Sequence, residues 1–379
     1  MKNSKILLVS LITILGTCLS SCGQDINSNT NDHAQDYILE LTKLDYVDFH
    51  SELQREFLND DYRKISLYAK GDKEYSRPES IYFEWDPVQQ IQEAIEIKNY
   101  TLMISEDINF STYSSFTTVD TYYDVYNLKI ATTYYWKVKA TLNNGTQIYS
   151  DVDDFETMDY GPRNLYVDGV TNVRDLGGWE TEDGRVKQGM IFRSGRFNKS
   201  SNSNVLVEVT LEGIDTMLNT LNVKSEIDLR MVSDNEIGGI TSSPIDESVN
   251  YYSCPMDYRV SNLLTDNIEM VKQVFSILAD KNNYPVVYHC NIGTDRTGLY
   301  AFLINGLLGV DENDLYVDYL FSNFGYIHGT RDLTEIKNSY IATIKSYDGE
   351  TLSEKIKNCL IDKGVNEQHL TSIIEILSN

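Results

Sequence analysis

The residues best suited to chemistry lie in the segment HCNIGTDRTG, residues 289–298. Five residues separate Cys290 from Arg296, and this spacing lets a loop turn its backbone N–H groups toward one anion. A thiolate at the start of the loop is a nucleophile, and the planar guanidinium of Arg296 can grip two oxygens of a phosphate. Gly293 permits a turn that a side chain would obstruct. The spacing therefore predicts a phosphate-binding loop that carries its own nucleophile.

Such a loop needs a strand before it and a helix after it. Residues 284–288, YPVVY, form an apolar, β-branched run that is typical of a buried strand, and residues 297–308 are predicted to be helical. The positive end of that helix would stabilise both a bound phosphate and the thiolate. A free thiol has a pKa near 8.5, and a helix N-terminus can lower it by several units. We therefore expect Cys290 to be a ready nucleophile.

Composition narrows the choice of partner. The chain has 379 residues and a formal net charge of −25, and such an acidic surface repels nucleic acid. The spacing of its 5 cysteines resembles neither a disulfide framework nor paired zinc ligands. The sequence thus predicts no nucleic-acid partner, no metal and no cofactor.

The N-terminus has the pattern of an export signal. Two lysines precede an apolar run over residues 6–19, and Leu19-Ser20-Ser21-Cys22 follows it. A short positive segment, an apolar stretch and small residues before a break are typical of a secretory signal, and the tetrapeptide resembles the bacterial lipobox. Residues 1–22 are therefore interpreted as a lipoprotein signal with Cys22 as the lipidated residue. The expected location is the cell membrane, lipid-anchored and extracytoplasmic.

Residues 23–60 are expected to form a tether, with helical periodicity around residues 37–44 indicating a short helix. Residues 61–159 contain short alternating strands, such as IYFEW at 81–85 and YYWKVKA at 134–140, separated by polar turns. The segment from Leu128 to Ala140 resembles a fibronectin type III sandwich around its tyrosine corner, Tyr134, with Trp85 as the early core tryptophan. The resemblance implies an all-β, immunoglobulin-like domain that acts as a spacer or binds a protein or a glycan.

Residues 160–379 alternate strands and helices, and their motifs match a known family in order and spacing. The loop resembles the HCxxGxDRTG signature of a bacterial tyrosine/lipid phosphatase family related to dual-specificity phosphatases. Three upstream segments resemble the same family: NVRDLGG at 172–178, IFRSG at 191–195 and IDLR at 227–230. The resemblance implies an α/β domain, dual-specificity-phosphatase-like, whose central sheet is flanked by helices.

The resemblance also implies roles. Cys290 would attack phosphorus and form a phosphocysteine, which water hydrolyses. Arg296 and the loop amides would bind the transferring group, Thr297 would hydrogen-bond the thiolate, and His289 would order the loop. Arg174 and Asp175 would shape the site from behind the binding residues. The expected phosphate-binding residues are Asn291, Ile292, Gly293, Thr294, Thr297 and His289.

Three carboxylates compete to supply the proton that the leaving oxygen needs. Asp257 stands where the dual-specificity phosphatases carry their general acid. Asp295 lies within the loop, where myotubularin-like lipid phosphatases also have an aspartate. Asp228 lies at a strand end and is equally a candidate structural partner of a nearby arginine. The choice among them stays open from sequence.

The substrate stays open as well. Many relatives carry a lysine before the loop aspartate, and it is associated with phosphoinositide recognition, whereas this chain has Thr294. The loss of that charge favours phosphotyrosine in a protein, or a small phosphomonoester, over inositol phosphates and phosphoinositides. The remaining alternative, from another class, is a phosphate-binding pseudoenzyme or adhesin that works through its sandwich domain.

Overall fold

The computed structural model describes residues 38–88, 96–198, 208–232 and 236–378. The chain divides into two compact units. The smaller unit contains residues up to Val47, Ser80–Val125 and Thr132–Thr157. The larger unit contains Asp48–Glu79, Tyr126–Ala131 and Met158–Asn379. The segments of the two units therefore alternate along the chain, and the larger unit is interrupted twice, after Glu79 and after Ala131.

The smaller unit is built from strands. One sheet has the order β1-β8-β6-β3-β4, with β7 paired to β6, and a second sheet pairs β2 with β5. The strands are β1 (Tyr46–Val47), β2 (Ile81–Glu84), β3 (Ile97–Ser105), β4 (Ser114–Thr118), β5 (Tyr122–Val125), β6 (Thr133–Leu142), β7 (Gln147–Tyr149) and β8 (Asp153–Thr157).

Strict alternation along β6 shows why this unit forms sheets. Tyr134, Trp136, Val138 and Ala140 are buried, whereas the residues between them are partly exposed. The Trp136 ring meets that of Phe83, on the second sheet, with centroids 5.0 Å apart. The strands expected at 81–85 and 134–140 are confirmed. Membership of the fibronectin type III family stays a prediction.

The helix expected around residues 37–44 is wrong for the residues described, which begin at Ile38. That segment is extended, and Leu41 forms an antiparallel bridge with Trp85. The backbone of Thr42 donates to Glu84, and that of Asp86 donates to Glu40, at 3.0 and 2.9 Å. Sheet pairing thus satisfies backbone groups that a helix would otherwise have satisfied within itself.

The larger unit is an α/β domain, and its sheet has the order β14-β13-β15-β12-β9. Neighbouring strands are parallel except for the pair of β12 with the short edge strand β9. The strands are β9 (Arg174–Asp175), β12 (Ile191–Ser194), β13 (Ser225–Asp228), β14 (Asn250–Ser253) and β15 (Val286–His289), and a separate hairpin pairs β10 (Glu180–Thr181) with β11 (Gly184–Arg185).

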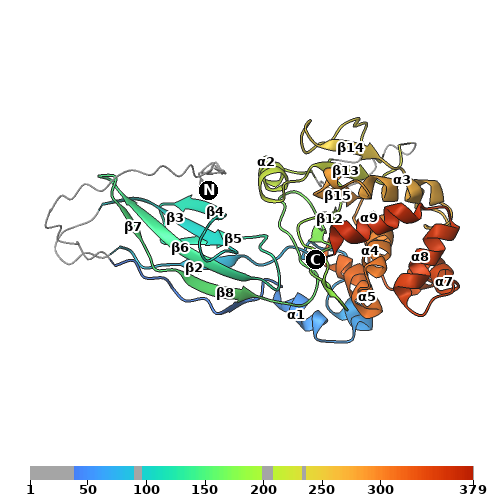
Figure 1. Cartoon of the computed structure of the whole chain (residues 1–379), viewed down its shortest axis with the longest axis horizontal. Helices are drawn as coiled ribbons and strands as arrows, with labels where there is room; N and C mark the ends of the chain where they lie inside the picture. The colour runs from blue at the N-terminus through green and yellow to red at the C-terminus, as the bar shows by residue number, and fades with distance from the viewer. Residues whose placement is uncertain (1–37, 89–95, 199–207, 233–235, 379) are drawn as a thin grey trace. The chain divides into compact units, whose positions relative to one another are not determined.

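Helices complete the unit (Figure 1). They are α1 (Glu52–Leu58), η1 (Tyr62–Leu67), α2 (Leu211–Asp215), η2 (Thr216–Thr220), α3 (Ile268–Leu278), η3 (Lys281–Asn283), α4 (Asp295–Leu307), α5 (Glu312–Phe321), η4 (Ser322–Phe324), α6 (Thr334–Ile336), η5 (Lys337–Ile341), α7 (Ala342–Lys345), α8 (Leu352–Asp362) and α9 (Glu367–Leu377).

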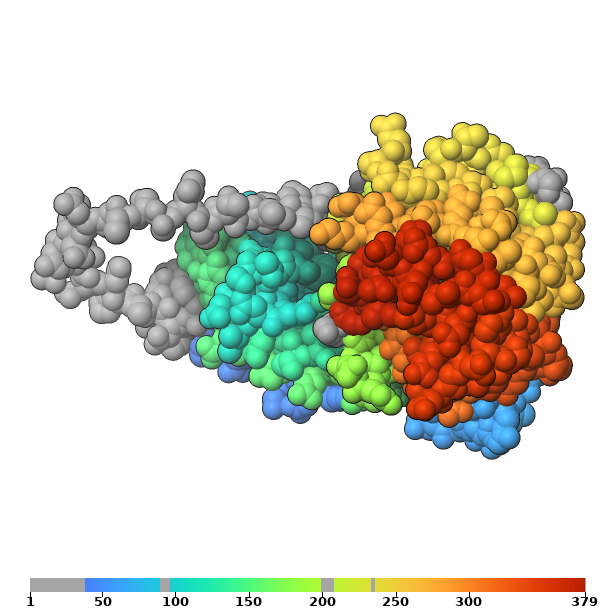
Figure 2. All heavy atoms as spheres, turned by 45° about the vertical axis from the view of Figure 1, so that its right-hand side comes forward, coloured from blue at the N-terminus to red at the C-terminus, as the bar shows by residue number. Residues whose placement is uncertain are grey.

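Two apolar cores lie on opposite faces of this sheet. Adjacent strand residues point to opposite faces, so Val286 joins the larger core with α3, α4 and α5, whereas Val287 joins a smaller core with Met217. Helix α4 is buried along nearly its whole length. The surface of the unit is formed partly by its C-terminal helices, orange to red in Figure 2. The expected α/β domain with a central sheet flanked by helices is confirmed.

The expected boundary at residue 60 is wrong. Residues 61–79 contain the 3-10 helix η1 rather than strands, and together with residues 48–60 they belong to the larger unit. Phe57, Ile65 and Ala69 are buried in its main core. Burying these apolar side chains in the core removes them from water and stabilises the fold, whereas a free tether would leave them exposed. The lipobox and Cys22 lie outside the described residues.

Among the described residues, no helix is both long enough and apolar enough to cross a bilayer.

Candidate active site

The predicted loop connects the central strand β15 to the start of α4. Cys290 directly follows His289, the last residue of β15, and is 2% exposed. Gly293 has φ +74, and a Cβ there would lie 2.6 Å from the backbone of Ser194. Only glycine therefore fits this turn. The strand, loop and helix have the predicted order.

The loop carbonyls are held from outside. Arg193 donates through Nη2 to the carbonyl of Gly293 at 2.8 Å. The side-chain amide of Asn172 donates to the carbonyls of Ile292 and Gly293 at 3.2 and 3.0 Å. Since each peptide plane carries its N–H opposite its C=O, binding these carbonyls from outside turns N–H groups toward the interior of the loop. This arrangement suits a bound anion.

A second layer fixes those donors. Asp318, on α5, pairs with Arg193 and also with Arg174, whose Nε lies 3.2 Å from Asp318 Oδ1. Arg174 also donates to Asn172 Oδ1 at 2.5 Å. Burial, together with the nearby charge of Arg193, lowers the pKa of Arg174 to about 10. Arg174 therefore supports the loop through Asn172.

Asp175 braces a different loop. Its carboxylate accepts from the backbone N–H groups of Gly177 and Gly189 and pairs with Arg163 at 2.5 Å. It is fully buried and orders the chain around β9. None of these partners belongs to the phosphate loop, so these contacts do not connect Asp175 to the loop as those of Arg174 do.

Arg296 is oriented by a carboxylate that the sequence did not single out. Nη1 and Nη2 lie 2.8 and 3.1 Å from Oε2 and Oε1 of Glu236, an end-on, two-point pair. Nη1 also donates to the carbonyls of Leu229 and Met256 at 3.2 and 3.3 Å. Within the described part of the chain, no acceptor is bound to Nε, so the Nε–Nη2 edge can serve two phosphate oxygens.

The charges of this pair support each other. Burial works against both ions, but the nearby Cys290 and Glu236 raise the pKa of Arg296 above its ordinary value. Burial alone would raise the pKa of Glu236, yet the hydrogen bonds and charge of Arg296 lower it. Tyr258 covers the guanidinium, with the ring centroid 5.1 Å from Cζ. Arg296 therefore stays charged in a fixed plane.

Two threonines of the predicted set carry buried hydroxyls. Thr294 and Thr297 are fully buried, and their hydroxyls have no hydrogen-bond partner among the residues that the structure describes. A buried hydroxyl without a partner is costly. The hydrogen bond expected between Thr297 and the Cys290 thiolate is not formed in this structure and stays a prediction.

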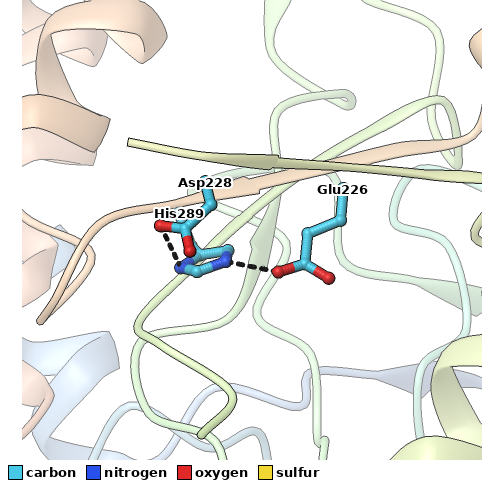
Figure 3. A group of neighbouring side chains, drawn as sticks. All are labelled: Glu226, Asp228 and His289. Atoms are coloured by element: carbon cyan, nitrogen blue, oxygen red, sulfur yellow. Dashed lines mark hydrogen bonds and ion pairs between the residues drawn. The ribbon is translucent and has the colours of Figure 1, made fainter. Parts of the chain in front are cut away.

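His289 is the centre of a buried network behind Cys290 (Figure 3). Its Nε2 lies 2.9 Å from Glu226 Oε1, and its Nδ1 lies 3.1 Å from the Cys290 carbonyl and 3.9 Å from Asp228 Oδ1. Both ring nitrogens thus face oxygen acceptors, and these contacts fix the orientation of the ring. His289 holds the backbone of the nucleophile, so the structure places it where it can order the loop.

The atoms of Glu226, Asp228 and His289 that could bind a metal lie within 4.8 Å of one another. The second carboxylate oxygen of Glu226 accepts from Ser243 at 2.5 Å. Both oxygens of Asp228 are held by Arg230, at 2.9 and 2.7 Å for the shortest contacts. Every candidate ligand atom therefore already has a protein partner, and the cluster fits a hydrogen-bond network better than a metal site.

The burial of Asp228 also determines which of its two possible roles it has. Its side chain is fully buried, and Tyr251 donates to Oδ2 at 2.9 Å. Burial opposes its charge, but His289 and Arg230 lower the pKa of Asp228. A carboxylate that is enclosed and held in its charged form does not meet a substrate. Asp228 is therefore a structural partner of Arg230, one of the two alternatives that the sequence left open.

Asp257 lies next to the arginine of the loop, since the carbonyl of the preceding Met256 accepts from Arg296. Its carboxylate is partly exposed and pairs with Arg259, with Oδ1 2.9 Å from Nε. The hydrogen bonds of Arg259, and its charge and that of Arg296, lower the pKa of Asp257. Asp257 thus has access to solvent but is charged in this state.

Asp295 is the first residue of α4 and is equally accessible, but it has two partners. Arg331 pairs with both of its oxygens, at 3.0 and 3.3 Å, and Tyr319 donates to Oδ1 at 3.3 Å. Asp295 and Arg331 line a hollow of about 380 Å³ with Tyr258, Leu263, Thr330, Asp332 and Glu335. The structure therefore places a cation beside the loop, although Thr294 itself carries none.

The sequence identified part of this site. Its motifs contained Asn172, Arg193 and Asp228, but the outward grip on the loop carbonyls was not foreseen for the first two. Glu236 and Arg331 were missed entirely, because each lies far from the loop in sequence and in no recognised motif. Two further cysteines, Cys254 and Cys359, are buried, and burial raises the pKa of their thiols to about 12 and about 11.

Comparison with known proteins agrees with this geometry. A model described as "Tyrosine phosphatase family" matches residues 165–372, more than half of the chain. The chain belongs to the tyrosine phosphatase family. The match covers the sheet, the phosphate loop and most of the C-terminal helices of the larger unit.

The individual proteins that this chain resembles are distant from it in sequence. A Cupriavidus necator protein named "Putative tyrosine-protein phosphatase" is 26% identical over 176 residues, 43% of this chain and 64% of the relative. The chain therefore spans slightly less than two thirds of that relative. The core catalytic domain of the PP-IP phosphatase Siw14 from S. cerevisiae is 16% identical, with 46% of this chain and 90% of that chain covered and a TM-score of 0.30. The sixth fibronectin type III domain of human fibronectin type III domain containing protein 3 is 18% identical over 24% of this chain and 92% of its own, with a TM-score of 0.19.

Proposed function

We propose that this chain is a cysteine-dependent phosphomonoesterase that needs no metal. The observation that carries the proposal is the juxtaposition of Cys290 and Arg296 on one loop whose carbonyls are bound from outside. A binding module needs the anion cradle but has no use for a nucleophile within it. The end-on pair with Glu236 supports the proposal further, because it leaves an edge of Arg296 for phosphate.

The chemistry follows from these groups. The Cys290 thiolate attacks phosphorus, the S–P bond forms, and the bond from phosphorus to the leaving oxygen breaks. A carboxylic acid, Asp257 or Asp295, gives its proton to that oxygen. Water then attacks the phosphocysteine and gives a proton back to the carboxylate that acted as the acid, the S–P bond breaks, and phosphate leaves while the thiolate is restored. Arg296 and the loop N–H groups hold the equatorial oxygens in both steps.

The Cys290→Ser variant tests this mechanism. We expect turnover of p-nitrophenyl phosphate to disappear while phosphate binding, measured by calorimetry, persists. Turnover at the wild-type level in this variant would refute the mechanism. A wild-type chain that binds phosphate but turns over no aryl phosphate between pH 5 and 7 would instead support the alternative of a phosphate-binding pseudoenzyme or adhesin.

Phosphotyrosine-type monoesters are the proposed substrates. Tyr258 and Leu263 line the hollow beside the loop and offer apolar surface to an aromatic ring. Three carboxylates, Asp295, Asp332 and Glu335, share that hollow with one arginine, and their excess charge disfavours a second phosphate on the substrate.

Inositol phosphates and phosphoinositides are the second candidate, and Arg331 is the observation that favours them. Its guanidinium lies beside the loop, near the place where relatives carry a lysine. A panel of phosphotyrosine peptides, inositol phosphates and phosphoinositides separates the candidates. If a second phosphate is bound, Arg331→Gln should raise KM for the polyphosphates but not for the phosphopeptides. An equal change in KM for both classes would count against this candidate.

We also propose that the chain is exported and lipid-anchored at Cys22, on the strength of the lipobox-like LSSC segment. Labelling cells with a fatty-acid analogue should mark the wild-type chain but not Cys22→Ala. The smaller unit is proposed to be a fibronectin type III-like module that binds a protein or glycan. Its support is the burial of Trp85 and Tyr134 at the expected positions, and binding of the full chain to glycan arrays tests it.

A further inference from the structure

Residues 70–76 lie in the first segment of the larger unit, Asp48–Glu79, and run along the loop of the same unit that follows η4. Gly71 donates to the carbonyl of Asn323 at 2.8 Å, and its own carbonyl accepts from Ile327 and Gly329. Tyr75 donates to the carbonyl of Phe324 at 2.6 Å. This segment therefore replaces water as the hydrogen-bond partner of the chain that follows η4.

Glu74 gathers four donors within this contact. One oxygen accepts from the backbone and hydroxyl of Ser76, the former at 3.0 Å. The other accepts from the hydroxyl of Thr171 and from the backbone of Tyr326, the latter at 3.4 Å. A carboxylate can satisfy all four donors, whereas an amide cannot, because it has a single acceptor oxygen.

Ser76 continues the connection to the loop. Its hydroxyl, which donates to Glu74, accepts from the backbone N–H of Asn172 at 3.0 Å. Asn172 has φ +59, a conformation that few residues adopt without support. The side chain of Asn172 then binds the carbonyls of Ile292 and Gly293 in the phosphate loop. Ser76 and Asn172 are both buried, so water does not replace a lost contact easily.

From this chain of contacts we infer that Glu74 and Ser76 are positioning residues for the phosphate loop. They fix Asn172, and Asn172 turns two loop carbonyls away from the anion. Without the Ser76 hydroxyl, the buried N–H of Asn172 has no acceptor. The left-handed conformation of Asn172 is then less stable. The loop N–H groups are then less well aimed, and both phosphate binding and turnover weaken.

Neither residue touches the phosphate, so the test must separate positioning from stability. Ser76→Ala, Glu74→Gln and Ser76→Thr are made in the full chain and compared below their unfolding temperatures. Phosphate affinity is measured by calorimetry and turnover with p-nitrophenyl phosphate. Ser66→Ala and Glu79→Gln are matched controls, since both lie exposed in the same segment of the larger unit.

We expect Ser76→Ala and Glu74→Gln each to weaken phosphate binding about five- to tenfold and to lower kcat/KM at least as much, which is the effect of losing one buried hydrogen bond. Ser76→Thr keeps the hydroxyl and should therefore retain wild-type phosphate binding and kcat/KM. In an Asn172→Ala background, Ser76→Ala should have little further effect, because the two act in series. The control variants should match the wild type.

Unchanged phosphate affinity and turnover per folded molecule in Ser76→Ala would overturn the inference, as would an undiminished effect in the Asn172→Ala background. The inference rests on the proposed function only for its turnover readout. If the wild type turned over no substrate, the phosphatase proposal would fail, while the phosphate titrations would still decide whether Glu74 and Ser76 position the loop.

Discussion

The two carboxylate oxygens of Glu236 lie 2.8 and 3.1 Å from Nη1 and Nη2 of Arg296. A side chain with several rotatable bonds is thereby fixed in one plane before any phosphate arrives. Fixing it in advance lowers the entropy cost of binding, and the pair keeps a buried guanidinium from being isolated. Glu236 is thus expected to matter for turnover although it carries no reacting atom.

Glu236→Gln tests this role. The amide has one acceptor in place of two, so Arg296 should lose its fixed plane, and kcat/KM should fall about 10- to 100-fold, with weaker phosphate binding. Steady-state kinetics with p-nitrophenyl phosphate and calorimetry with phosphate measure the two effects. Glu247→Gln, at an exposed position nearby in sequence, is the matched control. Wild-type kinetics in Glu236→Gln would show that Arg296 is oriented by other contacts.

The sequence predicted best those parts of the structure whose interacting residues are close together in the chain. Cys290 and Arg296 are separated by a fixed number of residues, and one loop performs their task, so spacing alone predicted strand, loop and helix. The strands of the smaller unit were equally readable, because alternation along β6 is a local property. In each case the residues that interact are close in sequence.

What could not be predicted depends on distant partners. Arg331 meets Asp295 across 36 residues, and Glu236 meets Arg296 across 60. No local pattern reports such pairs. For the same reason the sequence did not predict that residues 48–79 belong to the larger unit. Along the chain, the strands of the smaller unit come between Phe57 and most of the residues that bury it. The helix expected near residue 40 does not form, because Leu41 pairs with Trp85 as an extended segment.

The choice of general acid is predicted to favour Asp257. Asp295 is held from two sides by Arg331 and Tyr319, whereas the carboxylate of Asp257 has one side-chain partner, Arg259, among the residues that the structure describes. Asp257→Asn should lower kcat about 100-fold or more on phenyl phosphate, a poor leaving group, and much less on p-nitrophenyl phosphate. Asp295→Asn should lower both rates by a similar factor. If the leaving-group dependence appears in Asp295→Asn instead, the assignment is reversed.

The Arg259 contact gives a pH prediction. Arg259 lowers the pKa of Asp257, and a general acid must be protonated to act. Removing the cation with Arg259→Gln should raise that pKa, so a larger fraction of Asp257 is protonated at any given pH. The descending limb of kcat/KM should therefore move to higher pH. Arg63→Gln, an exposed arginine paired with Asp61, is the control, and an unmoved limb in Arg259→Gln would argue that Asp257 is not the group that titrates.

The stability prediction concerns Asp228 and has a definite sign. Its folded pKa is lowered, with Arg230 and His289 outweighing the effect of burial, while an unfolded aspartate titrates near about 3.9. The carboxylate therefore stabilises the fold above about pH 4, and this contribution is lost as the pH falls through the folded pKa. Asp228→Asn leaves the buried Arg230 without its counter-ion, which should cost roughly 3–5 kcal/mol at pH 7.

Thermal unfolding measures this cost. At pH 7 the Tm of Asp228→Asn should lie on the order of 10 °C below that of the wild type. As the pH falls from about 4 through the lowered pKa of folded Asp228, the contribution of the carboxylate is lost and the melting temperatures of the two proteins should approach each other. Asp183→Asn, the same change at an exposed position, should leave Tm unchanged at every pH. A gap that stays constant from pH 7 to pH 3 would mean that the loss comes from packing, and the charge of Asp228 would then contribute nothing to the fold.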